Sequence, residues 1–380
     1  MFGLYDSAFG ALTWGNIVML LIAGLLIYLG IARKMEPLLL VPIGFGVLLI
    51  NLPMGGLMEF ADGEPVGLLA RVFRGGITTE LIPAFIFLGL GALTDFGPLI
   101  SNPKTLILGA GAQFGVFFAF IVALLIGNAF PDFLEIGIEE AAAIGIIGGA
   151  DGPTTVFLTN KLAPDLIGVT AVAAYTYMAL VPIILPPIIR LLTTKEERAI
   201  YMKPLMKKVS KRQKLLFPII AAVIIILLVP RSAPLVGMFM FGNLLAVSGV
   251  TDRLADTAAN AFMNVLTIML GLSVGAFMSA DTFLRLDSLV VLGLGVVAFA
   301  TSTAAGILLA KLMNVFFKQK INPMIGAAGL SAVPMASRVV QRMGQQANPR
   351  NFLLMHAMGP NIAGVIGTAV AAGVFLGILG

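Results

Sequence analysis

The segment GGADGPTT at 148–155 places a carboxylate, Asp151, inside a chain that is otherwise strongly apolar. Three glycines and a proline surround this carboxylate, and helices seldom continue through such residues. An ionisable group at bilayer depth costs about 2.5 kcal/mol or more and usually marks an ion or proton path. Broken backbone at that depth must be satisfied by protein or by a water-filled cavity. The segment therefore predicts a cation site on an interrupted helix. The alternative, a helix cap in a surface loop, is disfavoured by the apolar flanks.

The composition of the 380 residues indicates an all-α polytopic membrane protein. Hydrophobic residues make up 59% of the chain and charged residues only 11%, whereas soluble domains carry about 25% charged residues. The chain has no Cys and a single His, His356, so we expect neither thiolate nor His-rich metal sites. The net charge of +5 comes mainly from one loop, so we expect no nucleic-acid binding. No GxxxxGK[ST] motif is present, so we do not expect ATP to be the energy source.

Apolar runs predict about ten spans of roughly 20 residues each. They lie near 15–32, 37–51, 81–96, 104–127, 166–190, 215–230, 234–250, 260–279, 287–315 and 350–378. Two further stretches, 136–160 and 321–345, are too interrupted to be simple spans. The basic segment 193–214 is expected to face the cytoplasm by the positive-inside rule. Contact with lipid headgroups, the alternative, would place it on the same side.

The two interrupted stretches resemble each other in sequence. AIGIIGGADGPT aligns with MIGAAGLSAVPM when residue 143 is set against 324, and IFLGLGA aligns with IMLGLSVGA when 86 is set against 268. The alternative is chance similarity between Gly- and Ala-rich segments. In the predicted topology the two hairpins open on opposite sides of the membrane, which indicates an inverted repeat with two re-entrant or broken-helix hairpins. Such repeats are typical of transporters with an ion site near the bilayer midplane.

The chain accordingly divides into four predicted parts. They are an N-terminal span (1–36), a first inverted repeat (37–192), a basic cytoplasmic loop (193–214) and a second inverted repeat (215–380). Hard cations prefer oxygen ligands, and both breaks contain them. The candidates are Asp151 and Thr154 in the first break, Asn322 and Ser331 in the second, and Asn361 in a predicted GPN break of the last span.

Four motifs resemble one known family. They are GGADGPTT, TNKLAPDLIGVTAVAAYTYMALVPII (159–184), NPMIGAAGLSAVPMASRV (322–339) and MGPNIAGVIGTAVAAG (358–373). Together they resemble the beta subunit of the biotin-dependent, sodium-translocating decarboxylases of oxaloacetate, methylmalonyl-CoA and glutaconyl-CoA. The resemblance covers nearly the whole chain from about residue 15. One departure is Leu185, where the family pattern leads us to expect Gln.

The resemblance implies a reaction, cofactors and partners. A soluble biotin-carrier and carboxyltransferase subunit would load biotin with CO2, and this chain would decarboxylate the carboxybiotin and export Na+ while a proton is consumed. Na+ and partner-borne carboxybiotin are thus the implied cofactors. The implied partners are that soluble subunit, a small gamma or delta membrane subunit, and further copies in a homo-oligomer, a trimer. The family also implies an elevator-type pump in the cytoplasmic (inner) membrane of a bacterium or archaeon.

The resemblance also assigns site residues. Asp151, Asn322 and Asn361 are implied as Na+ ligands, with Ser331 at or near a second Na+ site. Tyr177 and Arg338 match polar positions that matter in the family, so they join Asp151 as candidate catalytic residues.

Physical arguments give these residues roles. The Asp151 charge would offset the desolvation of Na+, and without the cation this buried carboxylate should bind a proton, because burial disfavours the charged form. Arg338 follows Ser331 by two helical turns and could hold the carboxybiotin carboxylate or snorkel to the interface. Tyr177 could donate a proton or simply pack with a satisfied hydroxyl. His356 is expected to be a helix–helix hydrogen-bond partner more than a proton relay.

The sequence is compatible with three functions. The leading hypothesis is the decarboxylase sodium pump, a translocase acting within a complex. The alternative is a secondary Na+-coupled symporter or antiporter with the same inverted architecture. A scaffold subunit without transport fits poorly, because both breaks carry polar residues.

Overall fold

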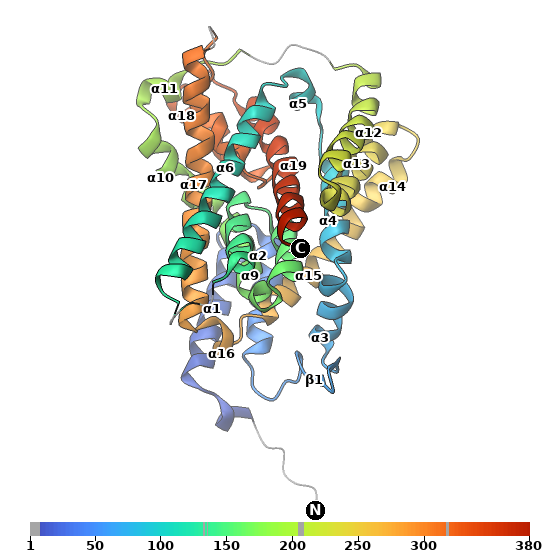
Figure 1. Ribbon diagram of the computed structural model, residues 1–380, viewed down its shortest axis with the longest axis vertical. Coiled ribbons are helices and arrows are strands. Elements are labelled where there is room, and N and C mark those ends of the chain that lie inside the picture. The colour runs from blue at the N-terminus through green and yellow to red at the C-terminus, as the bar shows by residue number, and fades with distance from the viewer. Residues whose placement is uncertain (1–7, 132–133, 135, 204–208, 317–318) are drawn as a thin grey trace, which may run out of the picture.

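The structure is a computed structural model that describes residues 8–131, 134, 136–203, 209–316 and 319–380. Helices run mainly along one long axis (Figure 1), and within the described residues the strands are limited to the short hairpin of β1 (Phe60–Ala61) and β2 (Glu64–Pro65). This confirms the predicted all-α fold. Part of the predicted basic loop, 204–208, lies outside the described residues.

The helices of the first half run from the N-terminus to the basic segment. They are η1 (Ala8–Ala11), α1 (Trp14–Ile31), α2 (Pro37–Ile50), α3 (Leu68–Val72), η2 (Phe73–Thr78), α4 (Leu81–Leu93), α5 (Gly97–Ser101), α6 (Thr105–Ala129), α7 (Ile138–Gly145), η3 (Ile146–Gly149), α8 (Gly152–Leu162), η4 (Pro164–Leu166), α9 (Ile167–Ala179) and α10 (Val181–Leu192).

The second half has a partly similar order of elements. Its helices are α11 (Lys195–Ala199), α12 (Lys211–Leu228), η5 (Pro230–Ser232), α13 (Ala233–Ser248), α14 (Asp252–Thr257), η6 (Ala258–Phe262), α15 (Met263–Ala276), α16 (Ala280–Phe283), α17 (Leu286–Phe316), η7 (Pro323–Gly329), α18 (Met335–Ala347) and α19 (Leu354–Leu379). A helix pair, a π-helical turn, a long helix and a break follow one another in both halves: α1–α2, η2, α6 and η3 against α12–α13, η6, α17 and η7.

Five helical segments in the described part of the chain are long and apolar enough to cross a membrane, and two bent pairs raise the total to seven. The predicted number of about ten was too high by this measure. Helices do form at the remaining predicted positions, but α2 and α13 have only 14 and 16 residues. A helix of that length falls short of the roughly 20 residues that an upright span needs.

The structure modifies two predicted details of the spans. The stretch 166–190 is not one straight helix, because α9 and α10 meet at a bend of 71°, and Pro182 lies at the start of α10. The GPN segment is no break, because α19 continues through Pro360. A proline inside a membrane helix removes one backbone hydrogen bond, and neighbouring groups can compensate for that loss. The interruptions within 136–160 and 321–345 are confirmed.

The two halves pack against each other in a reciprocal way. Helix α2 of the first half packs against α15 of the second, and α13 of the second packs against α4 of the first. Both contacts depend on paired glycines. A Cβ on Gly46 would lie 2.5 Å from the Leu272 carbonyl oxygen, and one on Gly91 would lie 1.9 Å from that of Phe239. Small residues allow such close approach of membrane helices.

Candidate functional site

The break between η3 and α8 holds Asp151 as the cap of a helix. Ala150 has a positive φ of 54°, which turns the chain sharply before the helix begins. Asp151 then accepts a hydrogen bond on Oδ1 from the Thr154 backbone N–H at 3.0 Å, as N-cap residues do. The side chain is only 2% exposed. The cap that was considered as the alternative is therefore present, but in the protein interior instead of a surface loop.

The second break delivers a donor to the same carboxylate. Ser331 Oγ donates to Asp151 Oδ2 at 2.5 Å, across 180 residues of sequence. The Ser331 backbone N–H also donates to the Gly149 carbonyl at 2.9 Å. Hydrogen bonds to an ionised carboxylate are short and strong. The tips of the two breaks thus meet, and Ser331, which the resemblance placed at or near a second Na+ site, contacts the same carboxylate.

Two further oxygens beside this contact have no hydrogen-bond partner within the described residues. They are the hydroxyls of Thr154 and Tyr175, and both are buried. The Tyr175 ring packs on Gly152, where a Cβ would lie 2.2 Å from the ring. Buried polar groups in native proteins are normally paired. These hydroxyls are therefore available to a ligand next to Asp151.

A cavity of about 360 Å³ opens beside the two tips. Asp151, Tyr175 and Ser331 line one side, and α4, α15 and the start of α2 line the other, contributing Glu36 and Asn264 among others. The cavity therefore lies between the break region and the helices that pack around α2 and α15. It is large enough for a dehydrated cation together with part of an organic ligand.

Asn361 and Asn322 have different surroundings. Asn361 Nδ2 donates to the Leu330 carbonyl at 2.5 Å, and its Oδ1 accepts from Ser337 at 3.1 Å. It therefore holds the residue next to Ser331. Asn322 begins η7, where its Oδ1 accepts from the Met324 N–H at 3.1 Å. Its Nδ2 donates to the carbonyls of the segment around α11, at 2.8 and 3.0 Å. Both Asn322 side-chain polar atoms are thus engaged away from Asp151.

Tyr177 and Arg338 do not contact the carboxylate in this structure. The Tyr177 hydroxyl donates to the Leu292 carbonyl at 2.6 Å, which matches the packing role considered from the sequence. Arg338 is exposed. The predicted shared helix face with Ser331 is wrong, because 331–334 are not helical and α18 begins only at Met335. The cause is Pro334, which cannot continue a helix from the preceding residue.

Glu36 and Tyr175 are the site residues that the sequence reasoning missed. Glu36 lines the cavity that holds Asp151, and its backbone has a positive φ of 37°, a strained conformation for a residue other than glycine. Burial raises the pKa of Glu36, while the charge of Arg338 acts in the opposite direction. The available signal was the position of Glu36 beside Pro37, between two apolar runs. For Tyr175 it was the motif at 159–184, in which only Tyr177 was chosen as a candidate site residue.

The described residues contain no group of three or more His, Cys, Asp or Glu side chains that could hold a metal ion. One carboxylate with hydroxyls and backbone carbonyls around it suits a hard monovalent cation better than a transition metal. Such a cation carries a single charge, which one carboxylate balances.

Comparison with known proteins identifies close relatives along nearly the entire chain. Residues 15–379 match the model of a family described as the Na+-transporting oxaloacetate decarboxylase beta subunit. The methylmalonyl-CoA decarboxylase subunit beta of Propionigenium modestum is 53% identical, and the match covers 99% of this chain and 98% of the relative. The glutaconyl-CoA decarboxylase subunit beta of Acidaminococcus fermentans is also 53% identical, over 99% and 96%. The oxaloacetate decarboxylase beta chain of Klebsiella pneumoniae is 50% identical, over 95% and 94%.

Proposed function

Because the chain belongs to the family of Na+-transporting decarboxylase beta subunits, we propose that its buried Asp151–Ser331 contact is the Na+ site of the pump. As a member of this family the chain is a multi-pass membrane subunit of a decarboxylase complex. This membership favours the sodium pump over the secondary symporter or antiporter. The one observation that carries the proposal is the meeting of a lone buried carboxylate with a hydroxyl from the other half of the chain.

The ligand set follows from the oxygens around Asp151. Removing Na+ from water is costly, and a full negative charge is the strongest compensation that a protein interior offers. The carboxylate of Asp151, the hydroxyls of Ser331, Thr154 and Tyr175, and backbone carbonyls supply oxygen ligands. Asn361 supports this set by holding the Leu330 carbonyl. Without Na+, Asp151 would retain a proton, which links Na+ release to proton uptake.

Asn322 belongs to the proposed set in a second state of the pump. Its amide must first release the carbonyls of Arg198 and Ile200. A ligand that exchanges partners in this way would couple ion binding to movement of the second break. The cavity between the break region and the packed helices α2, α4 and α15 is where an elevator-type movement of one against the other would occur.

An inverted repeat accounts for the matched order of helices in the two halves. Support comes from the reciprocal contacts, α2 with α15 and α13 with α4, and from the glycines at equivalent places in them. The matched order also favours including α1 in the first repeat, opposite α12, instead of beginning that repeat at residue 37. The segment 193–214 would lie between the repeats on the cytoplasmic side.

The carboxylated biotin of a partner subunit is the proposed substrate of the decarboxylation step. Arg338 is exposed, and its charge acts on Glu36, which lines the cavity at Asp151. Its guanidinium can pair with a carboxylate through two hydrogen bonds. Protonation of biotin on loss of CO2 would consume the proton. Tyr177 remains a candidate donor if its bond to Leu292 opens. The proposed partners are the biotin-carrying carboxyltransferase, a small gamma or delta subunit, and further copies of this chain in a trimer within a bacterial or archaeal inner membrane.

The Asp151→Asn variant tests the proposed Na+ site. The amide keeps the shape of the side chain but removes the charge that balances Na+, so Na+-stimulated decarboxylation by the purified complex should be lost. Assembly and the unfolding temperature should stay near those of the wild type. Wild-type Na+ stimulation in a folded Asp151→Asn complex would exclude Asp151 as the ion's counter-charge.

A further inference from the structure

A strap, residues 193–203, crosses the ends of η7, α18 and α19. Three asparagines hold its backbone. Asn322 and Asn351 donate to the Ile200 carbonyl at 3.0 and 2.7 Å, and Asn348 donates to the Ala199 carbonyl at 3.3 Å. Figure 1 places α11, α18 and α5 at one end of the molecule, opposite β1. The strap is therefore docked on this end of the helix bundle and is not a free basic loop.

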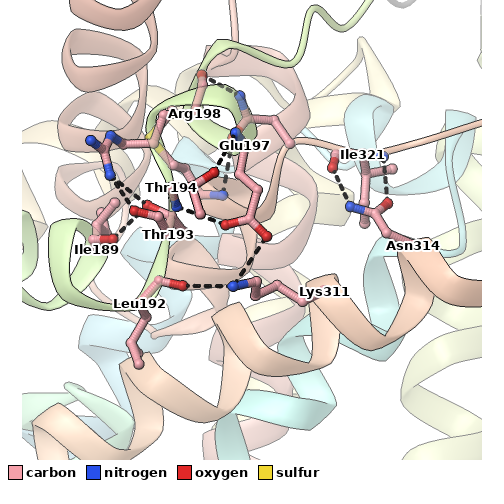
Figure 2. A network of polar contacts seen from close by, with 11 residues as sticks. Ile189, Leu192, Thr193, Thr194, Glu197, Arg198, Lys311, Asn314 and Ile321 are labelled. Atoms are coloured by element: carbon pink, nitrogen blue, oxygen red, sulfur yellow. Dashed lines mark hydrogen bonds and ion pairs between the residues drawn. The ribbon is translucent and has the colours of Figure 1, made fainter.

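The beginning of the strap is fastened to α17. Figure 2 shows Glu197 next to Lys311, with an Nζ–Oε1 distance of 3.1 Å. Lys311 also donates to the Leu192 carbonyl at 3.0 Å, and Arg198 donates to the Thr193 carbonyl. Residues 200–203, at the other end of the strap, line a cavity.

That cavity has a volume of about 820 Å³ and is lined by the strap, the start of α6, the end of α17 and the start of η7. Its lining includes three lysines, Lys104, Lys203 and Lys320, and no Asp or Glu among the described residues. It shares no lining residue with the cavity at Asp151. A concave site with charges of one sign concentrates ions of the opposite sign.

The cavity also holds a buried polar atom without a partner in the described part of the chain. His356 lines it and is 5% exposed. Its Nε2 lies 2.9 Å from the Lys203 carbonyl oxygen, so this nitrogen carries a proton. Its Nδ1 has no hydrogen-bond partner. A protonated imidazole would offer that second nitrogen as a donor.

We propose that the strap cavity is a binding site for a small oxyanion, a phosphate or carboxylate group. The lysines supply positive charge at the rim, and His356 supplies a buried donor when it is protonated. Thr105 and Asn102 add neutral polar groups to the lining. The occupant contacts both the strap and the start of η7, so it stabilises the docked strap. Because the protonated imidazole adds a donor, it strengthens binding as the pH falls. The other titratable groups among the described lining residues are the three lysines and Tyr201.

Thermal unfolding of the purified full chain, measured against inorganic phosphate at constant ionic strength, tests the site. Phosphate should raise the unfolding temperature. The double variant Lys203→Gln/Lys320→Gln should bind phosphate at least about fivefold more weakly, as expected for two partly exposed charges. His356→Gln retains a donor for the Lys203 carbonyl but lacks the Nδ1 position. The ratio of wild-type to His356→Gln affinity should therefore be larger at pH 6 than at pH 8, a comparison in which the ionisation of phosphate itself cancels.

Lys195→Gln is the matched control, because Lys195 is an exposed strap lysine that does not line the cavity. The same series in nanodiscs with phosphatidylglycerol and no free phosphate shows whether a lipid headgroup supplies the oxyanion. Stabilisation by either source that the double variant weakens and the control does not would support the site. No stabilisation by either source, or equal loss in the Lys195 control, would overturn the proposal. A ratio of wild-type to His356→Gln affinity that does not change with pH would remove His356 from the site.

Discussion

The two breaks resemble each other in sequence but differ in chemistry and in backbone. In the first, helix α8 begins directly after Asp151, which caps it. In the second, residues 330–334 stay outside any regular helix and α18 begins at Met335. The first break supplies a negative charge, and the second supplies a neutral donor, Ser331, to that same charge. The meeting point of the two breaks thus carries one charge, whereas two charges there would repel each other.

This difference shows how two similar breaks could form one proposed ion site instead of two. Two carboxylates in contact cannot both remain ionised, whereas a carboxylate and a hydroxyl share a hydrogen bond and leave oxygens for a cation. Arg338 follows the tip of the second break in sequence and is exposed. Its charge acts on Glu36. We therefore expect substitutions in the first break to affect ion binding, and substitutions beyond the second tip to affect the acceptance of an anionic substrate.

The largest effect on Na+-stimulated turnover is expected when the tips of both breaks carry a charge. Ser331→Asp would place two carboxylates in hydrogen-bond contact, so one would hold a proton and Na+-stimulated turnover should be lost near neutral pH. Ser331→Ala only removes a hydrogen bond to a charged group, an effect of about 1.5–3 kcal/mol. It should therefore weaken apparent Na+ affinity by at least about tenfold, with turnover restored at high Na+. Equal behaviour of the two variants in the Na+ dependence of decarboxylation would contradict the assigned difference.

The two tyrosines of α9 offer a smaller and sharper contrast. Tyr175→Phe removes an unpartnered hydroxyl beside Asp151, so apparent Na+ affinity should fall severalfold with little loss of stability. Tyr177→Phe removes the bond to the Leu292 carbonyl, which should cost about 1 kcal/mol of stability with Na+ affinity nearly unchanged. Both are measured by Na+ titration of turnover and by unfolding in denaturant. A larger Na+ effect for Tyr177→Phe would reverse the assignment.

Much of this arrangement could be predicted from the residues, but not all of it. The Gly and Pro residues around Asp151 predicted the first break, and the aligned segment predicted the second, because backbone chemistry is local. Tyr175 was not singled out, since its place beside Asp151 depends on the packing of its ring against Gly152. The role of Glu36 was hidden because its cavity is formed by helices far apart in sequence. The strap contacts of Asn322 were equally non-local.

The smallest expected effect concerns the pH dependence of Glu36. Burial raises its pKa above 4.5, and the charge of Arg338 opposes this. A raised folded-state pKa means that Glu36 contributes stability at low pH, which is lost as the pH rises through that pKa. Arg338→Ala removes the opposing charge, so this loss should move to higher pH. The measurement is the unfolding temperature as a function of pH. In a protein that also carries Glu36→Gln, Arg338→Ala should cause no such shift. A shift toward lower pH would show that Arg338 does not act on Glu36.

The central claim is that one buried carboxylate holds the transported ion. Equilibrium binding of radioactive Na+ to the purified chain tests it most directly, without dependence on the partner subunits or on turnover. Wild type and Asp281→Asn, which changes an exposed carboxylate in α16, should bind Na+ alike. Asp151→Asn should show no saturable binding over the same range. Saturable binding to folded Asp151→Asn with the wild-type dissociation constant would contradict the account and place the ion elsewhere in the molecule.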